Sequence, residues 1–350
     1  METLLELLKK TETYYTKKGI KNPRLEAEKL FAKALNLDRI MLYAKYDEKL
    51  SKEQKEIIKR CMQEDVKEEN EIKQLLDSSI VYLKKHNINE AALIAELIFS
   101  NVMKIDRLML FMSYDKKIDD DQKEKIRKML KKIAIDKLPY QYIINQQNFY
   151  GRDFYVDRGV LIPRYDTENL VEKVIKIADK NSIILDIGTG SGAIGITLAL
   201  ELPDSKVLAV DISEKAIDVA RKNKEDLSAK NVKILKSDVF SNVSFHEFDV
   251  IVSNPPYISN EEIENIGLDT YIHEPHEALF AKSDGLYFYY KIANEAREYL
   301  KNNGILAFEI GYKQKEAVCK ILEEFSYCDI NTYKDLDNHD RVIICRYRRG

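Results

Sequence analysis

The pattern of apolar and polar positions divides the chain into an N-terminal helical part and a C-terminal part in which strands and helices alternate. Residues 4–18 form an amphipathic stretch that stops at Gly19, a residue typical of helix C-termini. Asn22 and Pro23 then predict an N-cap followed by a proline at the first helical position. From about residue 161 onward, short apolar runs alternate with helical patterns, which predicts an α/β domain with a mostly parallel sheet.

The helical part contains an internal repeat. Its offset is 68 residues (105 − 37 = 68), and the matching pairs include Leu37 with Ile105, Asp38-Arg39 with Asp106-Arg107, Tyr46 with Tyr114, and the capping-box spacing of Ser51 and Gln54 with that of Asp119 and Gln122. Matches in one register over this length indicate a duplicated structural unit, which we expect to serve packing and partner contact. The expected domains are two helical copies, a linker or β-hairpin, and a catalytic domain, at residues 1–70, 71–138, 139–160 and 161–350.

Composition favours a globular protein of more than one domain. The chain has 350 residues, of which 45% are hydrophobic and 33% charged. The cysteines show no metal-ligand spacing and fit a reducing compartment better than a disulfide framework: Cys61, Cys319, Cys328 and Cys345. The N-terminus lacks the features of a signal peptide, and no apolar run is long enough to span a bilayer. We therefore expect a cytoplasmic protein with no membrane partner.

Charge is distributed unevenly along the chain. Residues 1–150 hold 30 Lys+Arg against 25 Asp+Glu, a balance of +5, which leaves 56 − 30 = 26 against 59 − 25 = 34 in residues 151–350, a balance of −8. An acidic catalytic half is poorly suited to a phosphate backbone. The charge pattern thus argues against a direct nucleic-acid partner.

A glycine-rich turn follows the first apolar strand of the α/β part. The strand covers residues 183–187, the turn is Gly188-Thr189-Gly190-Ser191-Gly192, and a helical pattern follows over residues 193–200. Such a turn lets the backbone approach a ligand closely and directs helix N-terminal N–H groups at it. The next strand, residues 207–210, ends in Asp211, which lies 19 residues beyond Gly192 and is placed to accept hydrogen bonds from ribose hydroxyls.

The turn alone allows two interpretations. Gly190 to Gly195 matches the G-x-G-x-x-G pattern of dinucleotide sites, which would suit a nicotinamide-dependent oxidoreductase. However, Asp186 lies two positions before the first glycine. A carboxylate there suits a ligand that carries an ammonium and a sulfonium better than it suits a pyrophosphate, which it would repel.

The motif at the end of a later strand favours the second interpretation, a ligand that carries a sulfonium. Residues 248–252 form an apolar strand that is followed by Ser253 and then by Asn254-Pro255-Pro256-Tyr257. The prolines stiffen the turn and lack N–H donors, so its carbonyl groups point outward. The amide oxygen of Asn254 and the carbonyl of Pro255 can accept both hydrogens of a planar NH₂ group, on which Tyr257 can stack.

This arrangement suits methylation of a conjugated nitrogen. The lone pair of a carboxamide or base amine is delocalised, and acceptors that pull on its protons localise the lone pair toward a methyl donor. Positioning alone can lower the barrier by roughly 7–11 kcal/mol, so no histidine or lysine base is needed. We therefore predict an S-adenosylmethionine-dependent N-methyltransferase in which Asn254, Pro255 and Tyr257 are catalytic, with no metal.

Beyond these motifs, the chain resembles the peptide-chain release factor glutamine methyltransferases. The resemblance covers residues 139–345 and is carried by Phe149 to Phe154, Val160 to Arg164, Thr167-Glu168, Leu185 to Gly192, Asp211, Ser237-Asp238, Asn254 to Tyr257, Glu274-Pro275, Ala278-Leu279, Asp284-Gly285, Glu309 to Gly311 and Asp340-Arg341. Each N-terminal copy also resembles the single small helical domain of that family. The sequence departs from the family at Tyr165, where a second proline is usual, and at Val239, where some relatives carry a larger side chain.

The resemblance implies the fold, the cofactor and the substrate. The fold would be a Rossmann-like, seven-stranded class I methyltransferase domain, preceded by an all-α N-terminal region. S-adenosylmethionine would be held by Gly188 to Gly192, Asp211 and Asn254, with Asp238 and Val239 beside the adenine. Asn254 to Tyr257 would hold the glutamine of the Gly-Gly-Gln loop in a release factor.

Alternatives remain at this point. Asn-Pro-Pro-Tyr is shared with amino-methyltransferases of RNA or DNA bases, the glycine loop leaves the oxidoreductase open, and the duplicated helices would suit a non-catalytic adaptor. His273 and His276 are three residues apart with a proline between them, so we interpret this segment as a solvated loop near the substrate entrance rather than a zinc site. Glu309, at the end of the strand over residues 305–308, is interpreted as structural.

Overall fold

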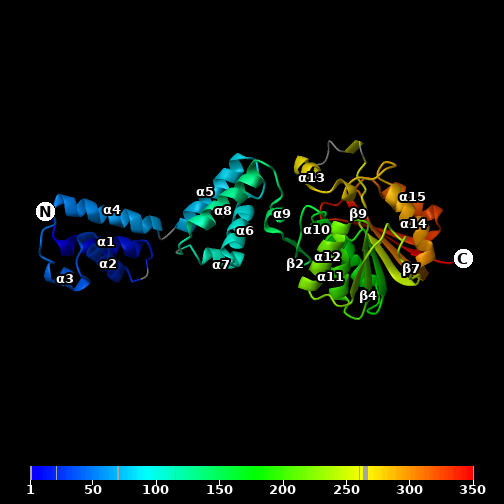
Figure 1. The fold of residues 1–350 in the computed structure, drawn as a ribbon, viewed down its shortest axis with the longest axis horizontal. Coiled ribbons are helices and arrows are strands. Elements are labelled where there is room, and N and C mark those ends of the chain that lie inside the picture. The colour runs from blue at the N-terminus through cyan, green and yellow to red at the C-terminus, as the bar shows by residue number, and fades with distance from the viewer. Residues whose placement is uncertain are drawn as a thin grey trace. The chain divides into compact units, whose positions relative to one another are not determined.

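A computed structural model describes residues 2–20, 22–68, 71–114, 116–259, 261–262 and 267–349 of the chain (Figure 1). Its internal contacts separate two units, Met1–Ile135 and Asp136–Gly350. Each unit is described by itself below.

In the first unit, one order of helices occurs twice among the described residues. The helices are α1 (Leu4–Lys17), α2 (Pro23–Leu35), α3 (Arg39–Ala44), α4 (Lys52–Glu68), α5 (Glu71–Lys85), α6 (Ala91–Met103), α7 (Arg107–Phe111) and α8 (Asp120–Ala134). In both halves, the third helix is short and the other three are long. The structural elements therefore repeat with the offset found in the sequence.

The buried side chains of this unit repeat as well. In the first half, a hydrophobic cluster of described residues is made of Leu4, Leu8, Leu30, Phe31, Leu42, Leu50 and Ile58. Adding 68 to each number gives residues that are also buried: Ile72, Leu76, Ile98, Phe99, Leu110, Ile118 and Ile126. Each half thus buries the same set of apolar positions.

Local capping contacts explain where several helices of this unit begin. The capping boxes expected at Ser51 and Asp119 are confirmed, because Gln54 and Gln122 exchange side-chain and backbone hydrogen bonds with them. The expectation for Asn22 is wrong in part. α2 does begin at Pro23, but Asn22 has left-handed backbone angles and its side chain makes no capping hydrogen bond.

The second unit begins with a short helix and a hairpin. α9 (Tyr140–Ile144) is followed by the antiparallel strands β1 (Gln147–Phe149) and β2 (Arg152–Phe154). Phe149 and Phe154 are fully buried and belong to the same hydrophobic cluster as Leu170 and Val171. Within the segment 139–160, which was expected to be a linker or hairpin, residues 147–154 form a hairpin that packs into the core of the second unit.

The centre of the second unit is a mixed sheet with the strand order β5-β4-β3-β6-β7-β9-β8. The strands are β3 (Ile183–Ile187), β4 (Lys206–Asp211), β5 (Val232–Lys236), β6 (Phe248–Ser253), β7 (Leu300–Glu309), β8 (Tyr327–Lys334) and β9 (Asp340–Tyr347). β5, β4, β3, β6 and β7 are parallel to one another, whereas β9 is antiparallel to both β7 and β8. The seven-stranded α/β domain expected from the sequence is confirmed.

Helices cover both faces of this sheet (Figure 1). One face carries α10 (Tyr165–Ile177), α11 (Ala193–Glu201) and α12 (Glu214–Asp226), and the other carries α14 (Tyr287–Tyr299) and α15 (Lys315–Glu324). Successive strand residues point to opposite faces, so Ile184 and Val250 pack in one hydrophobic cluster while Leu185 and Ile251 pack in the other. A short helix, α13 (Leu268–His273), and a 3₁₀ turn (His276–Ala278) lie between β6 and α14 in the chain.

The topology also determines where a ligand can bind. β3 is followed along the chain by β4 and β5 on one side, whereas β6 and β7 lie on its other side. Ligands of open α/β sheets bind at such a switch point, outside the carboxyl ends of the strands. The glycine turn after β3, Asp211 at the end of β4 and the Asn-Pro-Pro-Tyr turn after β6 all lie at this edge.

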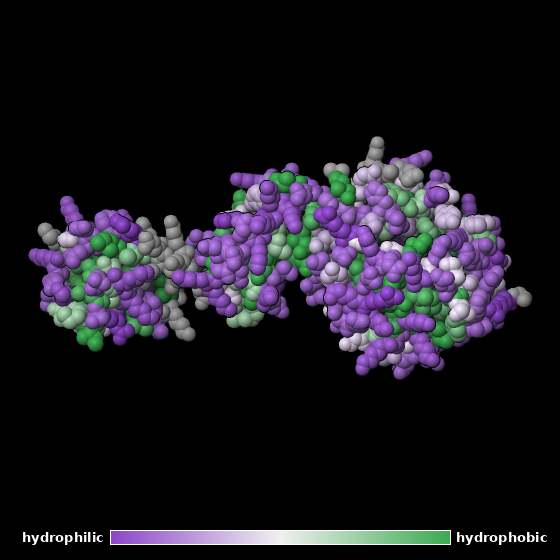
Figure 2. Space-filling model, in the orientation of Figure 1, coloured by the Kyte–Doolittle hydropathy of each residue, from purple (hydrophilic) through white to green (hydrophobic). Residues whose placement is uncertain are grey.

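Hydrophilic residues cover most of the visible surface, with smaller groups of hydrophobic residues between them (Figure 2). In the part of the chain that is described, no helix combines the length and the apolar character needed to cross a bilayer. Two of the exposed apolar side chains occupy equivalent places in the repeat: Ile40 on α3 is 79% exposed and Leu108 on α7 is 76% exposed.

Candidate active site

A cleft of about 910 Å³, including the solvent at its mouth, opens at the carboxyl ends of β3, β4 and β6. The site residues named from the sequence that line it are Gly188, Gly190, Asp211, Asp238, Val239, Asn254, Pro255 and Pro256. Four others do not line it: Thr189, Ser191, Gly192 and Tyr257. The structure thus brings the predicted cofactor loop and the proline turn together around one space.

Gly188 and Gly190 leave the cleft floor open. Both have positive φ angles, +71° and +58°, and a Cβ added to either would meet no atom within 4 Å. Between and after them, Thr189 and Ser191 are buried and hold the loop in place. The Thr189 hydroxyl donates to Asp186, and the Ser191 carbonyl accepts a 2.8 Å hydrogen bond from the Asn223 side chain. A ligand can therefore approach bare backbone on a loop that is fixed from the opposite side.

Asp186 has a different place from the one expected. Its carboxylate is fully buried and does not line the cleft. Oδ2 accepts from the Thr189 hydroxyl at 2.6 Å and from the Gly195 N–H at 2.9 Å, and burial raises the pKa of the carboxyl to about 7. A Cβ on Gly195 would lie only 2.8 Å from that oxygen. Asp186 therefore anchors the glycine turn. Its charge can act on a ligand only through its electrostatic field and not by direct contact.

Asp211 keeps its carboxylate at the cleft. Its two oxygens each accept a backbone N–H, from Gly190 and from Ser213, both at 2.9 Å. Burial raises the pKa of this carboxyl. Each carboxylate oxygen has further lone pairs, so Asp211 can also accept hydrogen bonds from a ligand hydroxyl.

Asp238 and Val239 form one wall of the cleft. Asp238 is exposed and accepts a 2.9 Å hydrogen bond from Lys291 of α14. Val239 is buried at φ +50°, an uncommon conformation for a β-branched residue. The Ser237 hydroxyl donates to the Val239 carbonyl at 2.9 Å, which helps to hold this strained turn and its apolar side chain at the cleft.

Asn254 is the polar side chain of the proline turn in the cleft. Its Nδ2 donates to the hydroxyl of Thr167 at 3.2 Å, and that hydroxyl donates to Glu309 at 2.6 Å. A side-chain amide that uses its nitrogen in this way presents its Oδ1 in the opposite direction. Asn254 is therefore held as a hydrogen-bond acceptor for a ligand.

Tyr257 differs from its expected placement. We expected its ring face to meet the substrate, but its hydroxyl lies 3.4 Å from Glu309 and its ring is not part of the cleft lining. Burial, with the nearby Glu309 carboxylate, raises the pKa of Tyr257. Its carbonyl accepts a 2.8 Å hydrogen bond from Gln314, whose Oε1 lies 3.3 Å from the Tyr289 hydroxyl. These contacts brace the proline turn.

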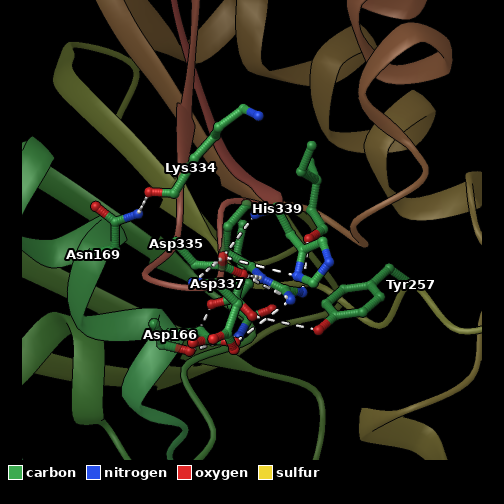
Figure 3. A network of polar contacts seen from close by, with 12 residues as sticks. Asp166, Asn169, Tyr257, Lys334, Asp335, Asp337 and His339 are labelled. Carbon is green, nitrogen blue, oxygen red and sulfur yellow. Dashed lines mark hydrogen bonds and ion pairs between the residues drawn. The ribbon is translucent and has the colours of Figure 1, made fainter.

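Charged residues continue this polar network away from the cleft (Figure 3). Figure 3 shows the Tyr257 side chain directed toward the group that contains Asp166 and Asp335. Arg341 of β9 joins these two carboxylates, with N–O distances of 3.5 Å to Asp166 and 3.2 Å to Asp335. The network therefore connects the proline turn to α10 and to the antiparallel part of the sheet.

The two histidines that we considered for zinc bond to the backbone instead. His273 pairs with the carbonyl of Asp136 at 2.7 Å, and His276 with that of Tyr271 at 2.8 Å. Among the residues that the structure describes, no cluster of potential metal ligands occurs. The expectation of a solvated loop is wrong for Glu274, which is buried and accepts hydrogen bonds from the Ile162 N–H and the Arg164 guanidinium.

Sequence reasoning missed the side chains that support Asn254. Thr167 lies in the first turn of α10 and Glu309 at the end of β7, and both are buried. A carboxylate that ends an apolar strand at the ligand-binding edge was the available signal for Glu309. Thr167 was named only as part of the family pattern, and its role beside Asn254 could not be inferred because only the fold brings α10 beside the proline turn. Tyr165, the departure from the family pattern, begins α10 and is 66% exposed, so it disturbs neither the helix start nor the core.

Comparisons with known proteins find family models and relatives that match most of the chain. The family model described as "Methyltransferase small domain" matches residues 165–287, and the "PrmC N-terminal domain" model matches twice, at residues 6–69 and 74–144. A release factor glutamine methyltransferase of Fusobacterium nucleatum is 42% identical over 89% of this chain and 93% of its own length. One of Clostridium botulinum is 40% identical over 79% of this chain and 99% of its own. A bifunctional methyltransferase of Rickettsia felis is 39% identical over 78% of this chain, which spans only 57% of that protein.

The chain belongs to the release factor glutamine methyltransferase family and is an S-adenosylmethionine-dependent enzyme. Membership of this family excludes the two alternative functions considered from the sequence, a nicotinamide-dependent oxidoreductase and a non-catalytic adaptor. The cleft fits the cofactor, because Gly188 and Gly190 leave open space, Asp211 offers carboxylate oxygens, and the buried Oδ1 of Asp186 has no hydrogen-bond partner among the described residues. An unpaired buried carboxylate oxygen favours a positively charged ligand nearby.

Proposed function

We propose that this protein transfers a methyl group from S-adenosylmethionine to the side-chain amide nitrogen of the glutamine in the Gly-Gly-Gln loop of peptide chain release factors. The names of its relatives supply the substrate class. The observation that carries the chemistry is the fixed amide of Asn254, whose nitrogen is committed to Thr167 while its oxygen is left to accept from a ligand.

Asn254 and Pro255 act on the two protons of the substrate NH₂. The Asn254 Oδ1 and the Pro255 carbonyl each accept one N–H, which places the nitrogen between two fixed dipoles. As the nitrogen gains positive charge during methylation, these N–H groups become stronger donors, so the contacts stabilise the transition state more than the ground state. Pro256 cannot donate a competing hydrogen bond, and the Gln314 contact to Tyr257 keeps the turn from relaxing.

The cofactor supplies an activated methyl group on its sulfonium. For its binding we propose Gly188 to Gly192, Asp211, Asp238, Val239 and Asn254. Within the loop, Gly188 and Gly190 give the close backbone approach, while Thr189, Ser191 and Gly192 maintain the conformation of the turn. The substrate would be held by Asn254, Pro255, Pro256 and Tyr257, the last through the turn that it closes.

The helical region is proposed to contact the release factor. We propose two copies, residues 1–70 and 71–138, followed by the connecting segment 139–160 and the methyltransferase domain 161–350. The equivalent exposed side chains Ile40 and Leu108 support a contact role, because each copy leaves the same apolar position uncovered.

Purified release factor incubated with the protein and S-adenosylmethionine tests this function. Peptide mass spectrometry should find one added methyl group on the glutamine of the Gly-Gly-Gln loop, and none when that glutamine is replaced by alanine. Asn254→Ala should abolish most of the product, whereas Asn169→Ala, which removes the same side chain outside the cleft, should not. Methyl incorporation into RNA or DNA in place of the release factor would overturn the proposal.

A further inference from the structure

Thr167 lies between the amide of Asn254 and the carboxylate of Glu309. Its hydroxyl oxygen is 3.2 Å from Asn254 Nδ2 and 2.6 Å from Glu309 Oε2. Thr167 is 4% exposed and Glu309 is 1% exposed, so solvent does not compete for these contacts. Neither side chain lines the cleft. The pair can therefore influence a substrate only through the proline-turn side chains that it contacts: Asn254, through Thr167, and Tyr257, whose hydroxyl lies 3.4 Å from Glu309.

The order of donors and acceptors determines which way the Asn254 amide faces. A threonine hydroxyl has one proton, and an ionised carboxylate can only accept. When Glu309 is ionised, Thr167 must donate to it and can offer only a lone pair to Asn254. Asn254 then satisfies Thr167 with its NH₂ group and turns its oxygen to the substrate. A protonated Glu309 can donate to Thr167, whose proton is then free to bind the Asn254 oxygen, which reverses the amide.

The charges around Glu309 act in both directions. Arg341 of β9 lies close enough to favour the carboxylate, and Asp166 of α10 disfavours it. Tyr257 contacts it at 3.4 Å, and the Tyr289 hydroxyl of α14 donates to its backbone carbonyl at 3.1 Å. Burial outweighs these contacts and raises the pKa of Glu309 to about 7. The two amide orientations are thus connected by a single protonation near neutral pH.

We propose that Thr167 and Glu309 are positioning residues for methyl transfer: the Glu309 carboxylate accepts a hydrogen bond from the Thr167 hydroxyl, and this contact fixes the Asn254 amide with its oxygen toward the substrate nitrogen. The inference rests on the proposed function, in which Asn254 accepts from the substrate NH₂. It adds a proton-dependent element outside the cleft, on α10 and β7. The enzyme should then lose activity on the acid side of neutrality because the reversed amide presents NH₂ to NH₂.

Steady-state kinetics with purified release factor as a function of pH test the proposal. Thr167→Val keeps the shape but removes the hydroxyl and should lower kcat about 10–100-fold, the scale of losing a hydrogen bond to a charged group, with little change in S-adenosylmethionine affinity. Thr167→Ser should retain most of the activity. Glu309→Gln, which cannot ionise, should lose the acid limb of the pH profile between about pH 6 and 8. Thr197→Val is the matched control, because Thr197 is also fully buried but its hydroxyl has no hydrogen-bond partner among the described residues.

A double-mutant cycle distinguishes positioning from a structural role. If Glu309 acts through Asn254, Glu309→Gln should slow the Asn254→Ala enzyme by less than twofold, although the same substitution alters the pH profile of the wild-type enzyme. The proposal would be overturned if the losses of activity from Glu309→Gln and Asn254→Ala were additive in the double variant. It would also be overturned if Glu309→Gln left the acid limb of the pH profile unchanged, or if Thr167→Val were as active as Thr197→Val. Melting temperatures of all variants near that of the wild type would exclude misfolding as the cause of lost activity. Thr167→Ser is the comparison variant, because it keeps the hydroxyl. A wild-type enzyme that does not methylate release factor would instead refute the proposed function.

Discussion

Gly285 offers a test of the proline turn from a residue outside the cleft. It has a φ of +81°, and a Cβ at this position would lie 2.6 Å from Gln314 Nε2 and closer still to the carbonyl oxygen of Tyr257. Real Cβ atoms essentially never approach another heavy atom to within 3.0 Å. Gly285→Ala must therefore displace the Tyr257 carbonyl and break or stretch the hydrogen bond that it accepts from Gln314.

The magnitude follows from two contributions. A left-handed alanine costs about 1–2 kcal/mol, and forcing an extra methyl group into packed surroundings costs about 1–3 kcal/mol more. Displacement of the turn by on the order of 1 Å would misplace Asn254 and lower turnover about 100-fold. The substitution should thus reduce both stability and the chemical step, although no atom of Gly285 lines the cleft.

Gly151→Ala separates the two contributions. Gly151 has nearly the same φ, +73°, but a Cβ there would meet nothing within 4 Å. Gly285→Ala should melt about 2–12 °C below Gly151→Ala, and its single-turnover rate at saturating substrates should fall while that of Gly151→Ala stays near wild type. Equal melting temperatures and equal rates for the two variants would refute the argument that the Tyr257 carbonyl holds the turn in register.

The remaining predictions concern the cleft, the glycine turn and the helical repeat. Asn254→Ala should lower kcat about 10²–10³-fold, the scale of losing one preorganised polar contact, while calorimetry shows cofactor affinity within a few-fold of wild type; near-normal turnover would remove Asn254 from the mechanism. The pKa of Asp186 is raised from 3.8 to about 7 in the folded protein, so the folded state binds this proton more tightly and stability falls as pH rises through that range. Asp186→Asn should therefore flatten the dependence of the urea midpoint on pH between about 4 and 7, and an unchanged dependence would contradict this assignment. Ile40→Asp combined with Leu108→Asp should raise KM for release factor with no loss of melting temperature, whereas Leu336→Asp, at a fully exposed place in the second unit, should leave KM unchanged; equal KM values would exclude the apolar contact.

Local chemistry was sufficient to predict much of the fold. The helix starts at Ser51 and Asp119 follow from contacts within four residues, and the strands follow from short apolar runs, so neither depends on distant parts of the chain. The glycine turn is also predictable from local chemistry, because the positive φ angles that it needs occur at Gly188 and Gly190, where glycine allows them. Asn22 was less predictable because its side chain could cap a helix in principle, while the left-handed backbone that it adopts moves the side chain away from that role.

The parts that sequence could not provide are those set by tertiary contacts. Asp186 precedes the glycine turn and was expected to face the ligand. Instead, its carboxylate points into the protein interior, where it packs against Gly195 and accepts a hydrogen bond from the Gly195 N–H. Tyr257 follows the prolines and was expected to offer a ring face, but Glu309 attracts its hydroxyl. Thr167 lies 87 residues before Asn254 in the chain, and only the packed α/β domain brings the two together.

A crystal structure of the protein with S-adenosylhomocysteine and a peptide that contains Gly-Gly-Gln would test the proposed mechanism most directly. The glutamine NH₂ should lie within hydrogen-bond distance of both the Asn254 Oδ1 and the Pro255 carbonyl, with its nitrogen facing the sulfur of the cofactor product across the cleft. A glutamine bound away from the proline turn, or an Asn254 whose oxygen bonds to Thr167 instead of the peptide, would contradict the mechanism.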